Sequence, residues 1–136
     1  MQVTLASRPS PDAVSNEDFI AATTSVVVVV DGASVPPGLS TGCVHGTAWF
    51  VRRLGVQLLA LLTTEANHSP ADSLAQAISQ VATLHADTCD LRHPGSPSAT
   101  VAILREQSET LDYLVLGDTT SCWRSPPASG WSLTTD

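Results

Sequence analysis

The stretch that decides the fold is residues 16–33, with the sequence NEDFIAATTSVVVVVDGA. At its centre, Val26–Val30 is an unbroken run of valines, and β-branched residues favour strands. A run without polar alternation is typical of a strand that is covered on both faces. The shorter segment Phe19–Thr23 predicts a second strand, with a turn at Thr24-Ser25. Two strands joined by so short a turn pair antiparallel, so we expect a hairpin.

Two helices are predicted after this hairpin. The first runs from about Thr41 to Leu62, follows a loop rich in Pro and Gly, and has Ser40 or Thr41 as its N-cap. The second begins at Ser69-Pro70, where a capping residue precedes Pro at the first helical position. Its apolar residues then recur at the helical spacing as far as Leu84.

A second hairpin is predicted from Ser98–Arg105 and Leu111–Leu116, with a turn between them. Met1–Ala6 alternates weakly and predicts a further short strand. Pairs of strands joined by short turns indicate antiparallel pairing, so the expected fold class is α+β and not a βαβ crossover fold. We expect one domain over residues 1–121 and an irregular C-terminal tail over residues 122–136.

The charge balance narrows the classes of partner. The sequence has thirteen Asp and Glu against six Arg and no Lys, giving a net charge of −7. Binding to nucleic acid or to an anionic membrane needs a basic face, so neither is expected, whereas an acidic surface suits divalent cations. No apolar run approaches the roughly 18 to 20 residues of a membrane helix, and the N-terminus lacks the pattern of a secretory signal. With three irregularly spaced cysteines, we expect a cytoplasmic protein with reduced thiols.

Acidic residues flank the predicted strands. Asp18 and Asp31 lie at the same end of the first hairpin, on strands roughly 5 Å apart, and Glu17 is beside them. Asp118 follows the last predicted strand in a similar way, after Gly117, which permits close backbone approach. Clustered carboxylates repel one another unless a cation neutralises them, and hard oxygen ligands favour Mg²⁺ or Mn²⁺. The alternative is structural, because Asp-Gly is a common turn signal and acidic loops are often only solvated.

Several motifs occur in one order along the chain. They are Asn16-Glu17-Asp18, then Val-Val-Val-Asp31-Gly32-Ala33, then Gly42–Gly46 with Trp49 and Arg53-Leu54-Gly55, then Ser98–Ala102, and finally Leu114–Thr119. Together they resemble the metal-dependent protein phosphatases of the PPM (PP2C) type, whose later hairpin ends in Gly-Asp-Ser. The third motif is similar to that of actinobacterial members. The resemblance extends over about residues 1–120.

The resemblance implies a PP2C-like α-β-β-α sandwich that holds a binuclear Mn²⁺ or Mg²⁺ site. Such enzymes hydrolyse phosphoserine and phosphothreonine in phosphoprotein substrates, often opposing a Ser/Thr kinase, by attack of a metal-bridging water. By this resemblance Asp31 bridges both metals, Glu17 ligates one of them, and the Gly32 carbonyl completes its shell. Asp18 holds metal-bound waters, so Asp31 and Asp18 are the expected catalytic residues. Asp118 matches an aspartate that helps to bind a third, weaker metal.

The sequence also departs from the family pattern. The family often has an arginine a few residues before the Asn-Glu-Asp position, whereas here only Arg8 is nearby, and Ala33 stands where eukaryotic members carry a histidine. Two further metal-binding aspartates come from the second half of the family domain, so the resemblance implies an N-terminal half. The alternatives are an inactive pseudophosphatase or fold remnant that acts as a binding module, and an unrelated α+β domain whose acidic turns are only turns.

Thiols and imidazoles form two further patterns. His85, Cys89 and His93 are spaced by four residues, as zinc ligands on one helix face would be, but a capped helix end with a buried cysteine is the favoured interpretation. Cys43 beside His45 suggests a cysteine nucleophile with its base, although packing at a helix start explains the pair better.

Overall fold

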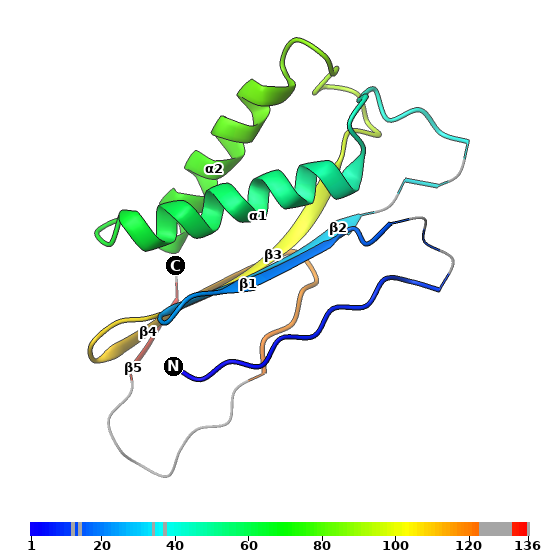
Figure 1. Ribbon diagram of the computed structural model, residues 1–136. Helices are drawn as coiled ribbons and strands as arrows, with labels where there is room; N and C mark the ends of the chain where they lie inside the picture. The colour runs from blue at the N-terminus through cyan, green and yellow to red at the C-terminus, as the bar shows by residue number, and fades with distance from the viewer. Residues whose placement is uncertain (12, 14, 34, 37, 123–131, 136) are drawn as a thin grey trace.

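A five-stranded sheet with two helices on one face makes up the fold. The computed structural model describes residues 1–11, 13, 15–33, 35–36, 38–122 and 132–135. Its elements are β1 (Asp18–Ala22), β2 (Val26–Ala33), α1 (Thr47–Thr64), α2 (Pro70–His85), β3 (Ser98–Glu106), β4 (Thr110–Leu116) and β5 (Ser132–Thr135). The strands lie side by side in chain order, β1 to β4 antiparallel and β5 parallel to β4. Both helices cover the same side of the sheet (Figure 1). The α+β prediction, with two helices between two strand pairs, is confirmed.

The valine run forms the central part of the sheet. Val26, Val28 and Val30 are at most 1% exposed and lie under the helices, while Val27 and Val29 on the opposite face are only half-buried. Because successive strand residues point to opposite faces, one valine run supplies both surfaces. The prediction that both faces are covered therefore holds for the helix side alone.

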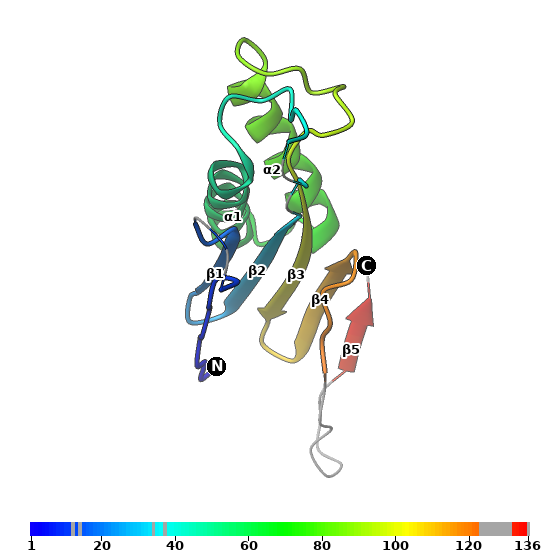
Figure 2. The ribbon, with the colours of Figure 1, turned by 90° about the vertical axis from the view of Figure 1, so that its right-hand side faces the viewer.

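The apolar core lies between the sheet and the helices. α1 packs across β1, β2 and β3, and α2 packs beside α1 and against β4 (Figure 2). The helices and β3 contribute to it Val51, Leu54, Leu58, Leu61, Leu62, Leu74, Ala77, Val81, Val101 and Ile103. Full burial of such a side chain contributes about 1.5–3 kcal/mol, so this layer holds the central strands β2 and β3 against the helices.

The starts of the two helices differ in how well the sequence predicts them. α1 begins at Thr47, later than expected, because Gly42 and Gly46 have φ angles of 65° and 74° that a helix cannot contain. α2 begins as predicted. The hydroxyl of its N-cap Ser69 accepts a hydrogen bond from the backbone N–H of Asp72 at 3.1 Å, and Pro follows the cap.

The two ends of the chain differ from the sequence predictions. Met1–Ala6 forms no strand, since almost all of its side chains are exposed and it has no apolar face to bury. This segment runs along the sheet side opposite the helices (Figure 1), and its terminal ammonium pairs with Glu106 at 2.8 Å. At the other end, the expected irregular tail contains β5, which pairs with Thr110–Tyr113. Residues 123–131 of that tail lie outside the described residues.

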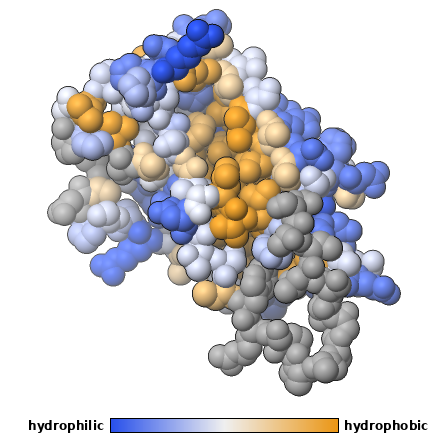
Figure 3. Space-filling model, turned by 180° about the vertical axis from the view of Figure 1, so that it is seen from behind, coloured by the Kyte–Doolittle hydropathy of each residue, from blue (hydrophilic) through white to orange (hydrophobic). Residues whose placement is uncertain are grey.

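Two apolar surfaces remain outside the core. On the far face of the sheet, a hollow of about 290 Å³ is lined by side chains of β2 and β3 and by residues 119–122. The view from behind, onto α2 and β4, shows apolar side chains gathered at its centre (Figure 3). The large exposed apolar residues on these two elements are Ile78, Leu84, Val115 and Leu116.

Candidate functional site

Two of the predicted acidic residues are direct neighbours in the sheet. Asp18 on β1 pairs with Asp31 on β2, as expected from the two equal arms of the hairpin. The next pair inward, Phe19 and Val30, belongs to the helix side, where Val30 is fully buried. Because side chains alternate along a strand, Asp18 and Asp31 both point to the face opposite the helices. Directly paired residues have Cα atoms about 4.5–5.5 Å apart, so the two carboxyl groups meet.

Asp118 reaches the same rim through the second hairpin. Asp31 pairs with Thr100 on β3, and the chain leaves β4 just beyond that level at Gly117. Gly117 has a φ of 90°, and a Cβ there would lie 2.5 Å from Cγ2 of Thr100, so only glycine fits this turn. The hydroxyls of Thr100 and Thr119 are hydrogen-bonded to each other and hold the turn against β3. The close backbone approach expected at Gly117 is present at this turn.

A cleft of about 470 Å³ joins these carboxylates to the N-terminal segment. Its lining includes Ala6, Ser7, Arg8, Asp18, Ile20, Asp31, Asp118, Thr119 and Thr120. We call Asp18, Asp31 and Asp118 the carboxylate rim. The cleft thus combines hard oxygen ligands with one guanidinium, the group that binds phosphate oxygens in a planar, bidentate way.

The carboxyl groups of the rim are close enough to change the pKa of Asp31. The pKa of Asp31 is raised above its ordinary value of 3.8, first by partial burial and then by the charge of Asp18. A hydrogen bond with the Asp18 side chain and the charge of Asp118 raise it further. Ionising all three carboxyl groups therefore costs free energy, and a cation bound between them would remove that cost.

Glu17 and Gly32 stand next to the rim without lining the cleft. The N–H of Gly32 donates to the carbonyl oxygen of Glu17 at 3.1 Å, so the two strands remain joined beyond the Asp18–Asp31 pair. Glu17 is half-buried, and its side chain is not among those that line the cleft. Gly32 faces α1, where a Cβ would lie 2.6 Å from Cγ2 of Thr47. The structure therefore brings Asp18, Asp31 and Asp118 to one cleft. The contact that it shows between Glu17 and this region is the hydrogen bond from the Gly32 N–H to the Glu17 carbonyl.

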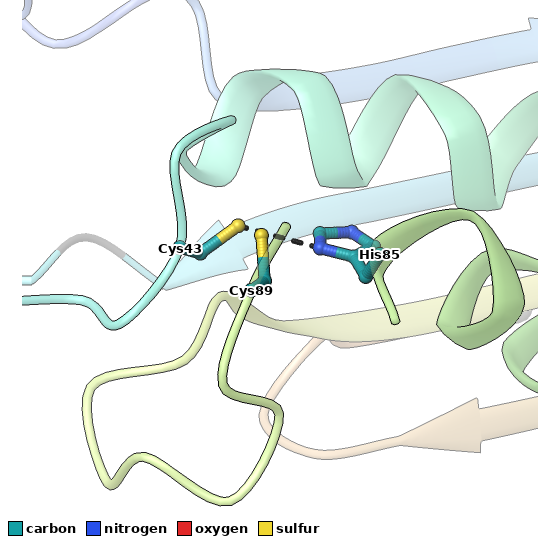
Figure 4. A group of neighbouring side chains, drawn as sticks. All are labelled: Cys43, His85 and Cys89. Carbon is teal, nitrogen blue, oxygen red and sulfur yellow. Dashed lines mark hydrogen bonds between the residues drawn. The ribbon is translucent and has the colours of Figure 1, made fainter. Parts of the chain in front are cut away.

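A second group of ligand-type side chains lies on the helix side of the sheet. Cys43, His85 and Cys89 point toward one another, and their Sγ and Nδ1 atoms all lie within 4.8 Å (Figure 4). We call this the thiol–imidazole cluster. Among the described residues, this is the group of three His, Cys, Asp or Glu side chains whose ligand atoms all lie within 4.8 Å of one another. The three carboxylates of the rim do not meet this distance. His93, the third residue of the zinc alternative, is not part of this group, because its Nδ1 instead accepts a hydrogen bond from the Gly95 N–H at 3.1 Å. Cys43 takes its place.

The cysteine-nucleophile hypothesis is not supported by the surroundings of Cys43. Its thiol lies 3.3 Å from Nδ1 of His85, whereas the ring of His45 stacks on Trp49 with centroids 4.1 Å apart. Burial, followed by a hydrogen bond with Cys89, raises the pKa of the Cys43 thiol, and burial lowers the pKa of His85. Both shifts favour a neutral thiol beside a neutral imidazole, whereas nucleophilic cysteines need the thiolate.

No protein-family model, curated protein or solved structure matches this chain. The resemblance to PPM phosphatases therefore rests on the ordered motifs. Within the described residues, none of the helices has the length and apolar character needed to cross a membrane.

Two features of the sites have no clear signal in the sequence. Arg8 lies in a segment without periodicity, and its place in the cleft follows from the path of residues 1–11 under the sheet. Cys43 and Cys89 are joined by an isolated antiparallel bridge between two loops. Only the four-residue spacing of His85 and Cys89 anticipates any part of that cluster.

Proposed function

We propose that this chain is part of a PPM-type phosphatase domain, which hydrolyses phosphoserine and phosphothreonine in proteins with Mn²⁺ or Mg²⁺. The observation that carries the proposal is the pairing of Asp18 with Asp31 in a cleft that Asp118 and Arg8 also line. Clustered hard carboxylates suit these cations. The pKa of Asp31 is raised first by partial burial and then by the charge of Asp18, and a bound cation would offset both effects.

The charged residues of the cleft have distinct roles in this proposal. Asp31 would hold the cations from its central place between Asp18 and Asp118, as its family position implies. The family pattern also makes Glu17 and the Gly32 carbonyl ligands, but here neither lines the cleft, so Asp18, Asp31 and Asp118 carry the proposal. Bound Mn²⁺ or Mg²⁺ ions supply an activated water and neutralise charge on the phosphoryl group. Asp18 would orient the attacking water by hydrogen bonding. Arg8 would grip the phosphate oxygens opposite the carboxylates.

The open face of the sheet supports the sandwich architecture within the same proposal. Val27, Val29, Ala102 and Leu104 line the hollow on the side away from the helices. In an α-β-β-α sandwich a second sheet packs on that face, and sheet-on-sheet packing needs such apolar residues. A cytoplasmic setting is also part of the proposal, since Cys43, Cys89 and Cys122 are all free thiols.

Hydrolysis of p-nitrophenyl phosphate tests this function. The chain should release p-nitrophenol in the presence of Mn²⁺, and Asp31→Asn should lower the rate roughly 100-fold or more because it removes the central carboxylate. Glu109→Gln is the matched control, since Glu109 is an exposed acid in the turn at the far end of the second hairpin. Equal rates for the parent and Asp31→Asn would show that the rim is not the catalytic site.

A second candidate function is phosphoprotein binding without hydrolysis. The observation that favours it is that the rim carboxylates do not gather as three ligands within 4.8 Å, as the thiol–imidazole cluster does. A loosely gathered rim would bind metal weakly, while Arg8 and the cleft would still accept a phosphorylated side chain. Saturable phosphopeptide binding that requires Arg8, with no hydrolysis, would select this function over catalysis. Absence of both phosphopeptide binding and Mn²⁺ binding would leave an α+β domain with ordinary acidic turns.

A further inference from the structure

The thiol–imidazole cluster joins two segments that are distant in the sequence. Cys43 lies in the loop before α1, His85 is the last residue of α2, and Cys89 follows in the next turn. The N–H of Cys89 donates to the His85 carbonyl at 2.9 Å, which keeps these two residues on one helical turn. Cys43 pairs with Cys89 through an antiparallel bridge, so the backbone itself brings the thiols together.

The separations within the cluster suit a tetrahedral metal. With Zn–S bonds of about 2.3 Å and Zn–N bonds of about 2.0–2.1 Å, a sulfur and a nitrogen ligand lie about 3.6 Å apart and two sulfurs about 3.8 Å apart. Here Sγ of Cys43 lies 3.3 Å from Nδ1 of His85, and all three ligand atoms lie within 4.8 Å. Shifts of a few tenths of an ångström to about 1 Å would place all three around one ion.

The imidazole of the cluster is held in place before any metal binds. His85 is 2% exposed, and its ring meets those of Trp49 and His45 edge-on at 84°. Nε2 has no hydrogen-bond partner, so the polar contact of the ring is the one that Nδ1 makes with Cys43. The N–H of His45 also points at Sγ of Cys43, 3.4 Å away, as the outer contacts of metal-bound thiolates do.

We propose that Cys43, His85 and Cys89 form a zinc site, with Nδ1 of His85 as the nitrogen ligand and one coordination position left for water or another ligand. Two sulfurs and an imidazole are soft and borderline ligands, which select Zn²⁺ over the Mn²⁺ or Mg²⁺ of the rim. Bound zinc would cross-link the loop before α1 to the end of α2. The cross-link would close a chain loop of more than 40 residues and so reduce the entropy of the unfolded chain. This site is independent of the proposed phosphatase function.

Cobalt substitution tests the site in the full chain. The reduced protein, freed of metal with a chelator, is titrated with Co²⁺ and then with Zn²⁺ under anaerobic conditions. We expect one Co²⁺ per chain with a thiolate-to-cobalt charge-transfer band and the intense visible bands of tetrahedral cobalt, which Zn²⁺ then abolishes. Cys43→Ser and Cys89→Ser should each weaken Zn²⁺ binding roughly 100-fold or more, because even outer-shell changes cost 10- to 100-fold. Circular dichroism checks that both variants remain folded.

Cys122→Ser is the matched control, since Cys122 is the exposed third thiol and should be irrelevant. Asp31→Asn should also keep the cobalt spectrum, which separates this site from the carboxylate rim. Alkylation of the parent protein gives a readout that needs no variant, because Zn²⁺ should protect Cys43 and Cys89 and leave Cys122 reactive.

Three results would overturn the proposal. One is a folded, reduced protein without the cobalt charge-transfer band. Another is loss of the band in Cys122→Ser while Cys43→Ser keeps it. The third is a disulfide between Cys43 and Cys89 that persists under reducing conditions and excludes metal, which would make the pair a structural cross-link instead.

Discussion

The carboxylate rim and the thiol–imidazole cluster differ in how the chain assembles them. The rim is made by strand register, since Asp18, Asp31 and Asp118 stand at strand ends, on a solvent-accessible face. The cluster is made by two loops and a helix end, around a buried imidazole on the helix side. One offers hard oxygens and the other soft sulfur and nitrogen, so the two proposed metal sites would differ both in ligand type and in place.

The largest expected loss of stability comes from substituting Gly32, which packs closely between the Glu17 carbonyl and α1. Gly32→Ala should cost about 3 kcal/mol of unfolding free energy, because its Cβ would lie 2.5 Å from the Glu17 carbonyl and 2.6 Å from Cγ2 of Thr47. Gly38→Ala is the control, since Gly38 has a φ of 88° but open space around it, and only the backbone strain of about 1 kcal/mol applies. Urea unfolding measures both. Equal losses would mean that the close contact at Gly32 is not a constraint.

The next effect is a reciprocal loss of metal binding. Asp31→Asn should weaken Mn²⁺ binding roughly 100-fold and leave Zn²⁺ binding unchanged, whereas Cys89→Ser should do the reverse. The physical reason is that the two ligand sets share no side chain. Isothermal titration calorimetry of the two variants with each metal gives all four affinities. A single variant that lost both metals would show that the two regions are coupled or that one of them had unfolded.

The smallest expected effect is a pH dependence with opposite signs in the two regions. The pKa of Asp31 is raised from 3.8, so the metal-free folded state binds that proton more tightly than the unfolded state does. The free energy of unfolding therefore falls as the pH rises above about 3.8. The pKa of His85 is lowered from 6.5, so stability is lost as the pH falls below about 6.5.

Melting temperatures measured from about pH 3 to about pH 8, with a chelator present, cover both the Asp31 and the His85 dependence. Asp31→Asn should be more stable than the parent at neutral pH, by less than about 1 kcal/mol because the group is well exposed to solvent. His85→Gln should remove the loss below pH 6.5. An Asp31→Asn variant less stable than the parent at neutral pH would contradict the repulsion at the rim.

Sequence patterns predict the parts of the molecule that depend on short-range periodicity. The valine run and its short turn fix the register that opposes Asp18 to Asp31, and the Ser69-Pro70 signal marks the start of α2. These features are predictable because each depends on neighbours a few residues away.

The rest depends on contacts between distant segments that have no period. The loop that carries Cys43 is held by glycines with positive φ, and its pairing with Cys89 is a contact between two loops. Arg8 reaches the cleft because residues 1–11 cross under the sheet, which no local pattern requires. β5 adds to the edge of β4 from a segment predicted to be irregular, because a four-residue strand gives too short a pattern.

Paramagnetic broadening by Mn²⁺ tests the central claim most directly. In ¹H–¹⁵N spectra of the full chain, substoichiometric Mn²⁺ should selectively remove the backbone signals around Asp18, Asp31 and Asp118, and Mg²⁺ should restore them by competition. Signals from the loop around Cys89 should remain sharp. Uniform broadening, or loss centred on other acidic residues such as Glu109, would contradict a shared cation at the rim.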